Sequence, residues 1–335
     1  MHQVIARCRT GSSHITRHKP CQDRLCHVQT PDFTLVLAVA DGHGSPEYSR
    51  SGIGARFAVY AAKKILPSDA PDEEVVADIK WLYDHLVARH LSRHPLSDRE
   101  MSLLSAARLH PVAAYGCTLA VAVIDYTRGT TTRYCLGDSG VFCIGADGRF
   151  PPSMPEDPAC VGSATSSMCQ SPETVKEHFR IQHLGIMAAV GVYSDGAEAE
   201  DWRAAEVLFS KGDEASEESM ENRVEKLLKL TDHGDDQTYV LAVDPEAVTT
   251  DAFQAGLAEE VHRGHQLLAI TRGVEKRKQM ETYLRLLLEK SKRLSGSEAV
   301  KFKDEVLRPA AEEFAALNNT IEVLRKELKE LEEVP

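Results

Sequence analysis

Short apolar runs alternate with polar, glycine-containing turns along the chain as far as Pro245. Apolar runs of this length, bounded by turn residues, predict buried β-strands. The pattern is present at residues 33–40, 117–124, 130–136, 186–193 and 239–243. Gly129 lies between the second and third of these runs and predicts a hairpin turn there.

The segments between these runs predict helices and one long loop. Ser45-Pro46 combines a capping hydroxyl with a proline at the first helical position, so a helix is expected from there to about Leu66. Helical pattern also covers residues 72–109 and 216–230. Residues 148–172 are dense in Pro, Ser and Gly and predict a loop, and long loops in compact domains are often functional.

After Pro245 the pattern is helical throughout. Ser295 and Glu298 match a capping box at the start of a last helix, and Pro309 is expected to kink or begin a helix. In this region apolar residues recur every seven positions at Val300, Leu307, Phe314, Ile321 and Leu328, and again at Ala310, Leu317, Leu324 and Leu331. Such a repeat is typical of a coiled-coil seam.

The change of pattern predicts two domains, one at residues 1–248 and a helical coiled-coil region at residues 249–335. Two interpretations of the second domain remain open. The heptads mediate homodimerisation or the docking of a partner protein, or the helices fold back on one another as a hairpin within one chain.

Composition excludes several classes of protein. The 335 residues carry a formal net charge of -12, which argues against a nucleic-acid partner because phosphate backbones bind basic surfaces. No apolar stretch is long enough to span a membrane, and the first residues lack the apolar core of a signal peptide. The eight cysteines include no Cys-x-x-Cys pair, so we expect reduced thiols in a cytoplasmic protein and no zinc ribbon.

Acidic residues stand in turns beside the apolar runs. A strand end fixes the backbone, glycine permits a sharp turn, and the carboxylate is presented at the edge of the sheet. Mg²⁺ and Mn²⁺ prefer such oxygen ligands. A single Asp-Gly is more often a plain turn, so the argument depends on the set: Gln22-Asp23, Asp41-Gly42-His43-Gly44, Gly137-Asp138, Ser194-Asp195-Gly196 and Gly234-Asp235-Asp236.

In order and spacing these motifs resemble the PPM family of metal-dependent protein phosphatases, the type 2C enzymes, over about residues 8–244. Gly116-Cys117-Thr118-Leu119-Ala120 and Asp235-Asp236-Gln237-Thr238 add to the likeness, and Gly11-Ser12-Ser13-His14 with Pro20-Cys21-Gln22-Asp23 resembles a bacterial branch of the family. The resemblance implies an α+β fold, a β-sandwich of two antiparallel sheets flanked by helices, with metals bound in a cleft at one end.

The resemblance also implies roles for individual residues. Asp41 would bridge two Mn²⁺ or Mg²⁺ ions and the Gly42 carbonyl would ligate one of them. Asp195 and Asp235 would hold the other ion, and Asp138 matches a third, weaker metal position. In the same family pattern, Asp23 orients metal-bound water, and His43 acts as the general acid for the leaving alkoxide.

The chain departs from the family pattern at three positions. Gln22 stands where many members have a glutamate that ligates metal through water. His18 occupies the usual place of the phosphate-binding arginine, so either Arg17 or Lys19 beside it would serve, and we name Arg17. Asp236 stands where asparagine is common, and the first acid of that motif, Asp235, is expected to be the ligand.

The implied function is a protein serine/threonine phosphatase. Water activated by the metals would attack phosphorus in line without a phosphoenzyme, and the substrate would be a phosphoprotein of a cognate serine/threonine kinase. The alternative is a catalytically weak pseudophosphatase that acts as a coiled-coil adaptor. The presence of all five expected carboxylates favours the enzyme.

Overall fold

The computed structural model describes residues 1–67, 70–160, 164–210 and 218–332. The chain forms two compact units, residues 1–258 and residues 259 onward. The sequence pattern placed this division at 248/249. The boundary in the structure, at 258/259, instead lies within helix α8 (Asp251–Ser291), whose first turns belong to the first unit. Phe253 and Leu257 of these turns are buried.

The first unit contains two antiparallel sheets, which confirms the predicted β-sandwich. One sheet has the strand order β1-β9-β8-β6 and the other β2-β3-β4-β5-β7. The strands are β1 Gln3–Arg9, β2 Arg24–Gln29, β3 Thr34–Ala40, β4 Leu119–Asp125, β5 Thr130–Leu136, β6 Gly140–Ile144, β7 Arg180–Gly185, β8 Ala189–Tyr193 and β9 Gln237–Val243.

Strand β3 shows why the apolar runs are continuous. Successive side chains point to opposite faces of a sheet. Leu37 and Val39 therefore join the core between the two sheets, whereas Val36 and Ala38 join the core beneath the covering helices. Because both faces of the strand are buried, neither set of positions is polar.

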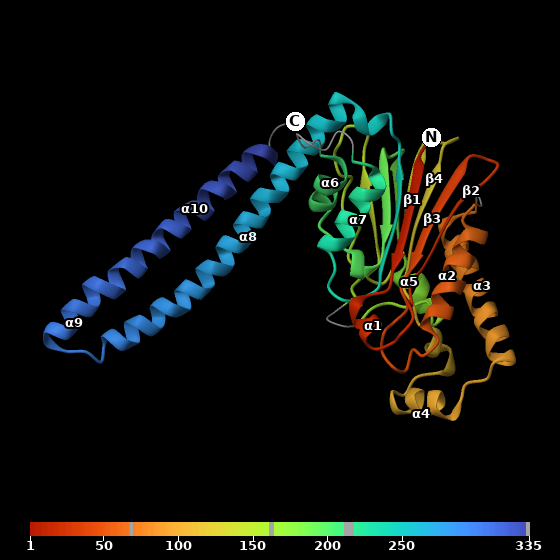
Figure 1. Ribbon diagram of the computed structural model, residues 1–335, viewed down its shortest axis with the longest axis horizontal. Helices are drawn as coiled ribbons and strands as arrows, with labels where there is room; N and C mark the ends of the chain where they lie inside the picture. The colour runs from red at the N-terminus through yellow and green to blue at the C-terminus, as the bar shows by residue number, and fades with distance from the viewer. Residues whose placement is uncertain (68–69, 161–163, 211–217, 333–335) are drawn as a thin grey trace. The chain divides into compact units, whose positions relative to one another are not determined.

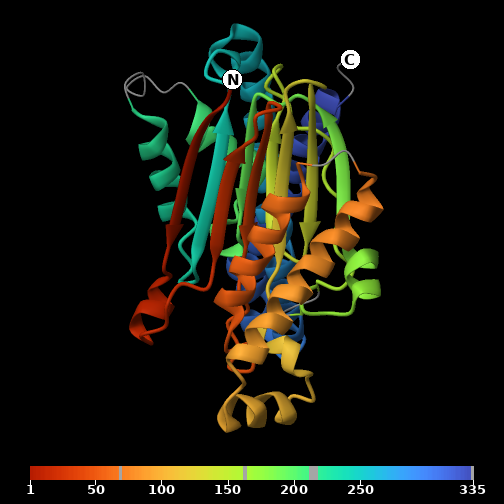
Figure 2. The same ribbon diagram turned by 90° about the vertical axis from the view of Figure 1, so that its right-hand side faces the viewer.

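Helices cover both outer faces of the sandwich, α2 and α3 on one side and α6 and α7 on the other (Figures 1 and 2). Small side chains such as Ala58 and Ala62 let α2 lie close to its sheet. The α-helices that lie wholly within the first unit are α1 Ser12–Thr16, α2 Ser51–Ile65, α3 Asp72–Arg93, α4 Asp98–Ala106, α5 Pro172–His178, α6 Asp201–Phe209 and α7 Met220–Leu230. Its described 3-10 helices are η1 Pro111–Tyr115, η2 Asp195–Ala197 and η4 Ala247–Thr249.

Two predicted helix starts change. The helix expected from Ser45 begins at Ser51, because the Arg50 N–H donates to the Ala114 carbonyl (2.8 Å) and the preceding residues form turns. Of the helix expected at residues 216–230, the structure has α7, and residues 216–217 lie outside the described part. The loop expected at 148–172 has no helix or strand before α5 in its described residues, and residues 161–163 lie outside them.

The second unit is a helical hairpin, which is the fold-back alternative. Helix α8 continues to Ser291, and α9 (Gly296–Phe302), one π-helical turn (Lys303–Leu307) and α10 (Arg308–Glu332) follow. In α10, Ile321 is buried, and a Cβ added to Gly273 of α8 would lie 2.9 Å from its side chain. Ile321 of the predicted seam therefore packs against α8 of the same chain, whereas Val300 is 63% exposed and the side chain of Leu331 lies outside the described part.

Two expectations concern the start of the last helices. Ser295 is the N-cap of α9, but its side chain makes no capping hydrogen bond, so the predicted capping box is wrong. Gly296, directly after the cap, has a left-handed φ of +61°, which glycine adopts without strain. Helix α10 begins at Arg308, one residue before Pro309, as expected of a proline near a helix start.

Within the described residues, no helix combines the length and the apolar character that crossing a membrane requires.

Candidate active site

The predicted acidic residues lie at one end of the sandwich because of the strand directions. Antiparallel neighbours place the end of one strand beside the start of the next. Ala40 at the end of β3 pairs with Arg24 at the start of β2, and Tyr193 at the end of β8 pairs with Tyr239 near the start of β9. Asp41 and Asp195 follow such strand ends, and Asp23 precedes such a start.

A pocket of about 570 Å³ opens at this end of the sandwich. Every predicted site residue except Asp23 lines it, namely Arg17, Asp41, Gly42, His43, Asp138, Asp195 and Asp235. Asp23 lies beneath the pocket and is fully buried. The pocket wall also includes Lys19, the alternative phosphate ligand, and His14 and Thr118, for which no role was predicted.

The backbone around Asp41 is held by the adjoining strand. The Asp41 N–H donates to the Thr118 hydroxyl (3.2 Å), and the Thr118 N–H donates to the Asp41 carbonyl (2.9 Å). A Cβ at Gly42 would lie 2.9 Å from the Gln22 carbonyl oxygen, so only glycine allows this close approach. The Asp41-Gly42 turn is therefore fixed in position before any ligand binds.

The turn that carries Asp195 is fixed in a similar way. The Thr238 N–H donates to the Ser194 hydroxyl (3.0 Å), and the Ser194 N–H donates to the Thr238 carbonyl (3.0 Å). A Cβ on Gly196 would lie 2.0 Å from the Asp236 carbonyl oxygen. These contacts explain why Ser194, Gly196 and Thr238 accompany the acidic residues in the sequence.

The carboxylates crowd one another. Burial, followed by the charges of Asp23 and Asp195, raises the pKa of Asp41 well above its usual range. Burial also raises the pKa of Asp23 to about 7. Asp195 Oδ1 is buried and accepts no hydrogen bond from a described residue. Negative charge and unused acceptor oxygens together favour a cation at this point.

The carboxylate oxygens of the pocket suit a hard divalent ion that is bound by few protein side chains. No three His, Cys, Asp or Glu side chains among the described residues are grouped so that they could hold a metal ion. Asp235 is 61% exposed, and its Oδ1 accepts the Asp236 N–H (2.8 Å). Mg²⁺ is commonly bound through one or two carboxylates with waters completing its shell, and Asp41 with Asp195 supplies such a pair.

His43 lies at the pocket wall, where its ring meets the edge of Tyr48 with centroids 4.8 Å apart. Burial lowers the pKa of His43 to about 4, and the Asp195 charge partly opposes this shift. The imidazole is therefore neutral at pH 7. A bound phosphate group would raise the pKa, because negative charge stabilises the imidazolium.

Asp236 fixes the segment that carries the cationic side chains. Its buried carboxylate accepts the N–H of Gly11 (2.8 Å) and the N–H of Gln22 (2.6 Å), and it lies 3.0 Å from His14 Nδ1. This assembly positions α1, at whose end Arg17 stands exposed in the pocket wall. In the sequence, Gly11-Ser12-Ser13-His14 indicated only a likeness to a bacterial branch of the family, and the contact with Asp236 became apparent from the structure.

Lys19 and Gln22 are engaged elsewhere. Lys19 Nζ donates to the Gly44 carbonyl (3.0 Å), and the Gln22 side-chain amide donates to the Ser51 hydroxyl (2.5 Å). Arg17 forms no ion pair with a described residue, so its guanidinium is the more available of the two candidate phosphate ligands.

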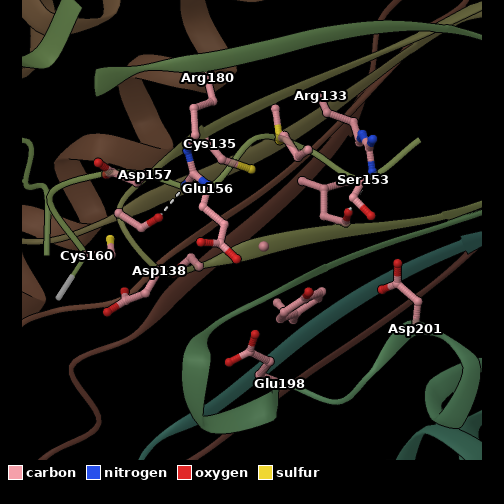
Figure 3. Close-up of a pocket in the computed structure, with 16 residues that line it drawn as sticks. Arg133, Cys135, Asp138, Ser153, Glu156, Asp157, Cys160, Arg180, Glu198 and Asp201 are labelled. Carbon is pink, nitrogen blue, oxygen red and sulfur yellow. Dashed lines mark hydrogen bonds between the residues drawn. The ribbon is translucent and has the colours of Figure 1, made fainter. Parts of the chain in front are cut away.

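A second hollow, of about 340 Å³, adjoins the first at Asp138, which lines both. Figure 3 shows Arg133 and Arg180 on one side of this hollow and Glu198 and Asp201 on the other. Arg133 is only 3% exposed, and its Nε has no hydrogen-bond partner among the described residues. No short motif joins these residues, so sequence reasoning missed this hollow.

The chain belongs to the protein phosphatase 2C family, whose sequence pattern matches residues 10–231. A comparison with curated proteins finds no match.

Among solved structures, two variants of a bacterial serine phosphatase share the fold. One has 13% identity and a TM-score of 0.50, with 73% of this chain and 99% of the other covered. The second has 14% identity and the same TM-score, with 72% and 97% covered. The serine/threonine phosphatase Stp1 from Staphylococcus aureus has 14% identity and a TM-score of 0.48, covering 73% and 95%. The match to the family's sequence pattern thus confirms the family, and the two structures with a TM-score of 0.50 agree with the predicted fold.

Proposed function

We propose that the chain is a protein serine/threonine phosphatase that hydrolyses phosphoserine and phosphothreonine monoesters with water and without a phosphoenzyme. The observation that carries this proposal is the single pocket lined by Arg17, Asp41, His43, Asp195 and Asp235, which come from distant parts of the chain. Family membership supports the same reaction class.

Each residue has a distinct task in this proposal. Asp41, the Gly42 carbonyl, Asp195 and Asp235 would hold two Mn²⁺ or Mg²⁺ ions, with waters completing their coordination shells, and Asp138 would offer a third position. Bound divalent ions supply a water of lowered pKa and neutralise charge on the phosphoryl oxygens.

The other side chains act on the substrate and on proton transfer. Arg17 binds the phosphate, for which a planar guanidinium is well suited. Asp23, buried below Asp41, orients the attacking water. His43 takes up a proton once the phosphate raises its pKa and delivers that proton to the leaving oxygen. Substrate residues beside the phosphorylated side chain would enter the second hollow past Asp138.

Metal removal tests this proposal. Purified full-length chain is expected to hydrolyse a phosphothreonine peptide in the presence of Mn²⁺ or Mg²⁺, and to lose that turnover with a chelator and regain it on adding metal back. Phosphate release, measured as a rate against metal concentration, is the readout. A folded protein with no metal-dependent turnover would instead support the adaptor alternative.

We also propose that the hairpin of the second unit binds a second copy of this chain or a partner protein in the cytoplasm. Tyr283, Leu286 and Val323 are each more than half exposed there. A contact with another protein would remove the apolar area of these side chains from water. Light scattering on the full chain and on a chain ending at Ala258 tests dimerisation. Equal monomers in both would exclude a second copy.

A further inference from the structure

Two cysteines lie side by side near the N-terminal end of the first unit. Cys8 stands in β1 and Cys21 in the segment that leads to Asp23, and their Sγ atoms are 3.4 Å apart. Cys8 is exposed and Cys21 is partly exposed, so small solutes can reach both sulfurs. No other two described cysteines share a hydrogen-bond contact between their sulfurs; Cys26, for example, donates to the Val59 carbonyl.

The two thiols have different hydrogen-bond partners and different burial, so their pKa values differ and so does their reactivity toward oxidants. The hydrogen bond from Cys21 lowers the pKa of Cys8 to about 6, and the Thr238 hydroxyl also donates to Cys8 Sγ (3.3 Å). The same contact, together with burial, raises the pKa of Cys21. Cys8 is therefore suited to be the attacking thiolate, and Cys21 to be the second thiol that retains its proton.

We propose that Cys8 and Cys21 form a modification site at which a hydroperoxide converts the two thiols into a disulfide. The Cys8 thiolate attacks one peroxide oxygen, the O–O bond breaks, and the alcohol or water leaves with a proton, so that Cys8 becomes a sulfenic acid. Cys21 sulfur then attacks the Cys8 sulfur, the S–O bond breaks, and the Cys21 proton leaves with the hydroxide as water. Two thiols and one peroxide thus give one disulfide, one alcohol and one water.

The closure requires only a small movement. The sulfurs must approach from 3.4 Å to a bond length of about 2.0 Å, which Cys21 can accommodate because its segment is only partly buried. The resulting loop, residues 8–21, contains α1 and Arg17. The hydrogen bonds from Gly11 and Gln22 to Asp236 tie both ends of this loop to the same carboxylate, so the disulfide would reinforce an existing arrangement.

The chemistry and its effect are measured on the full-length chain treated with hydrogen peroxide. Peptide mapping without reductant is expected to recover Cys8 linked to Cys21, with the intact mass reduced by two hydrogen atoms. The oxidised protein should melt about 5 °C higher than the reduced protein, because the disulfide restricts the unfolded chain, and reductant should reverse the shift.

Three variants test whether Cys8 and Cys21 form the disulfide, and none of the measurements depends on phosphatase activity. Cys8→Ser and Cys21→Ser should each abolish the linked peptide and the rise in Tm, whereas the control Cys26→Ser should retain both. If peroxide leaves Cys8 and Cys21 reduced, or oxidises Cys8 to a sulfinic acid without linkage, while circular dichroism shows folded protein, the proposed site is wrong. Linkage without a rise in Tm would exclude the stabilising role.

Discussion

Replacing Asp41 with asparagine is expected to lower metal-dependent phosphatase activity on the order of 10³-fold. Asp41 joins Asp195 in the carboxylate pair proposed to hold the divalent ions. An amide keeps the shape of the side chain but loses the negative charge that a hard cation requires. Metal-assisted activation of water contributes several kcal/mol to catalysis, and about 4 kcal/mol corresponds to this loss of rate.

The same substitution should leave the metal-free protein at least as stable as the wild type. Burial and the charges of Asp23 and Asp195 raise the pKa of Asp41 on folding. A carboxyl whose pKa is raised on folding destabilises the folded state at pH values above its unfolded pKa, because the ionised form is less favourable in the fold. Asparagine carries no charge, so it avoids this destabilisation at pH 7. The substitution should therefore lower the phosphatase activity without lowering the stability of the metal-free protein.

Both effects are measured on one set of proteins. Initial rates with a phosphothreonine peptide at saturating Mn²⁺ give the activity, and urea unfolding with a chelator present gives the stability. Asp78→Asn, on the exposed face of α3, is the matched control and should change neither. Retention of metal-dependent turnover by Asp41→Asn would contradict the assignment of Asp41 to the ions.

The strands that could be predicted from the sequence are mainly those that are buried on both faces. Strands β3, β4 and β9 are buried along nearly their whole length, so they appear as continuous apolar runs. In contrast, the strands that were not predicted, β1, β2, β6 and β7, are the edge strands of the two sheets, and β1, β2 and β7 are only partly buried. Their identity depends on pairing with distant segments, which composition over a short window does not encode.

The site could be predicted as a set of residues but not as an arrangement. The order of the acidic turns and the resemblance to the family predicted Asp41, Asp138, Asp195 and Asp235, and the structure places all four in the wall of one pocket. The role of Asp236 depends on the N–H groups of residues more than two hundred positions away, and the pKa of His43 depends on burial. Both properties arise only when the two sheets are assembled.

The heptads predicted a packing surface on α10 but not the helix that packs against it. The apolar side chains of α10 can be buried by a helix of the same chain as well as by a helix of a second chain. The Lys276–Glu313 ion pair (3.1 Å) and the close approach of Gly273 to Ile321 identify α8 as that partner. Spacing along one helix contains no information of this kind.

Glu100→Gln is expected to lower the free energy of unfolding by about 2 kcal/mol at pH 7. The Arg50 guanidinium donates to both Glu100 carboxylate oxygens, at 2.8 and 3.0 Å, and joins α4 to the residue before α2. These bonds, chiefly, lower the pKa of Glu100 to about 2 from its ordinary 4.5. A shift of this size corresponds to at most about 3 kcal/mol, and the pair is largely shielded, with Arg50 12% and Glu100 19% exposed.

The pH dependence identifies the charge as the cause. Because the folded pKa is depressed, the stabilisation is complete above about pH 4.5 and is lost as the pH falls toward 2, so the difference between wild type and Glu100→Gln should shrink over that range. Glutamine can still accept the Ser97 N–H of the capping box, so the helix start is retained.

Glu73→Gln is the control variant. Glu73 is 79% exposed beside Lys176, so the loss of its charge should leave the free energy of unfolding in urea unchanged. A difference between wild type and Glu100→Gln that stays constant from pH 7 to pH 3 would show that packing, and not the ion pair, stabilises α4.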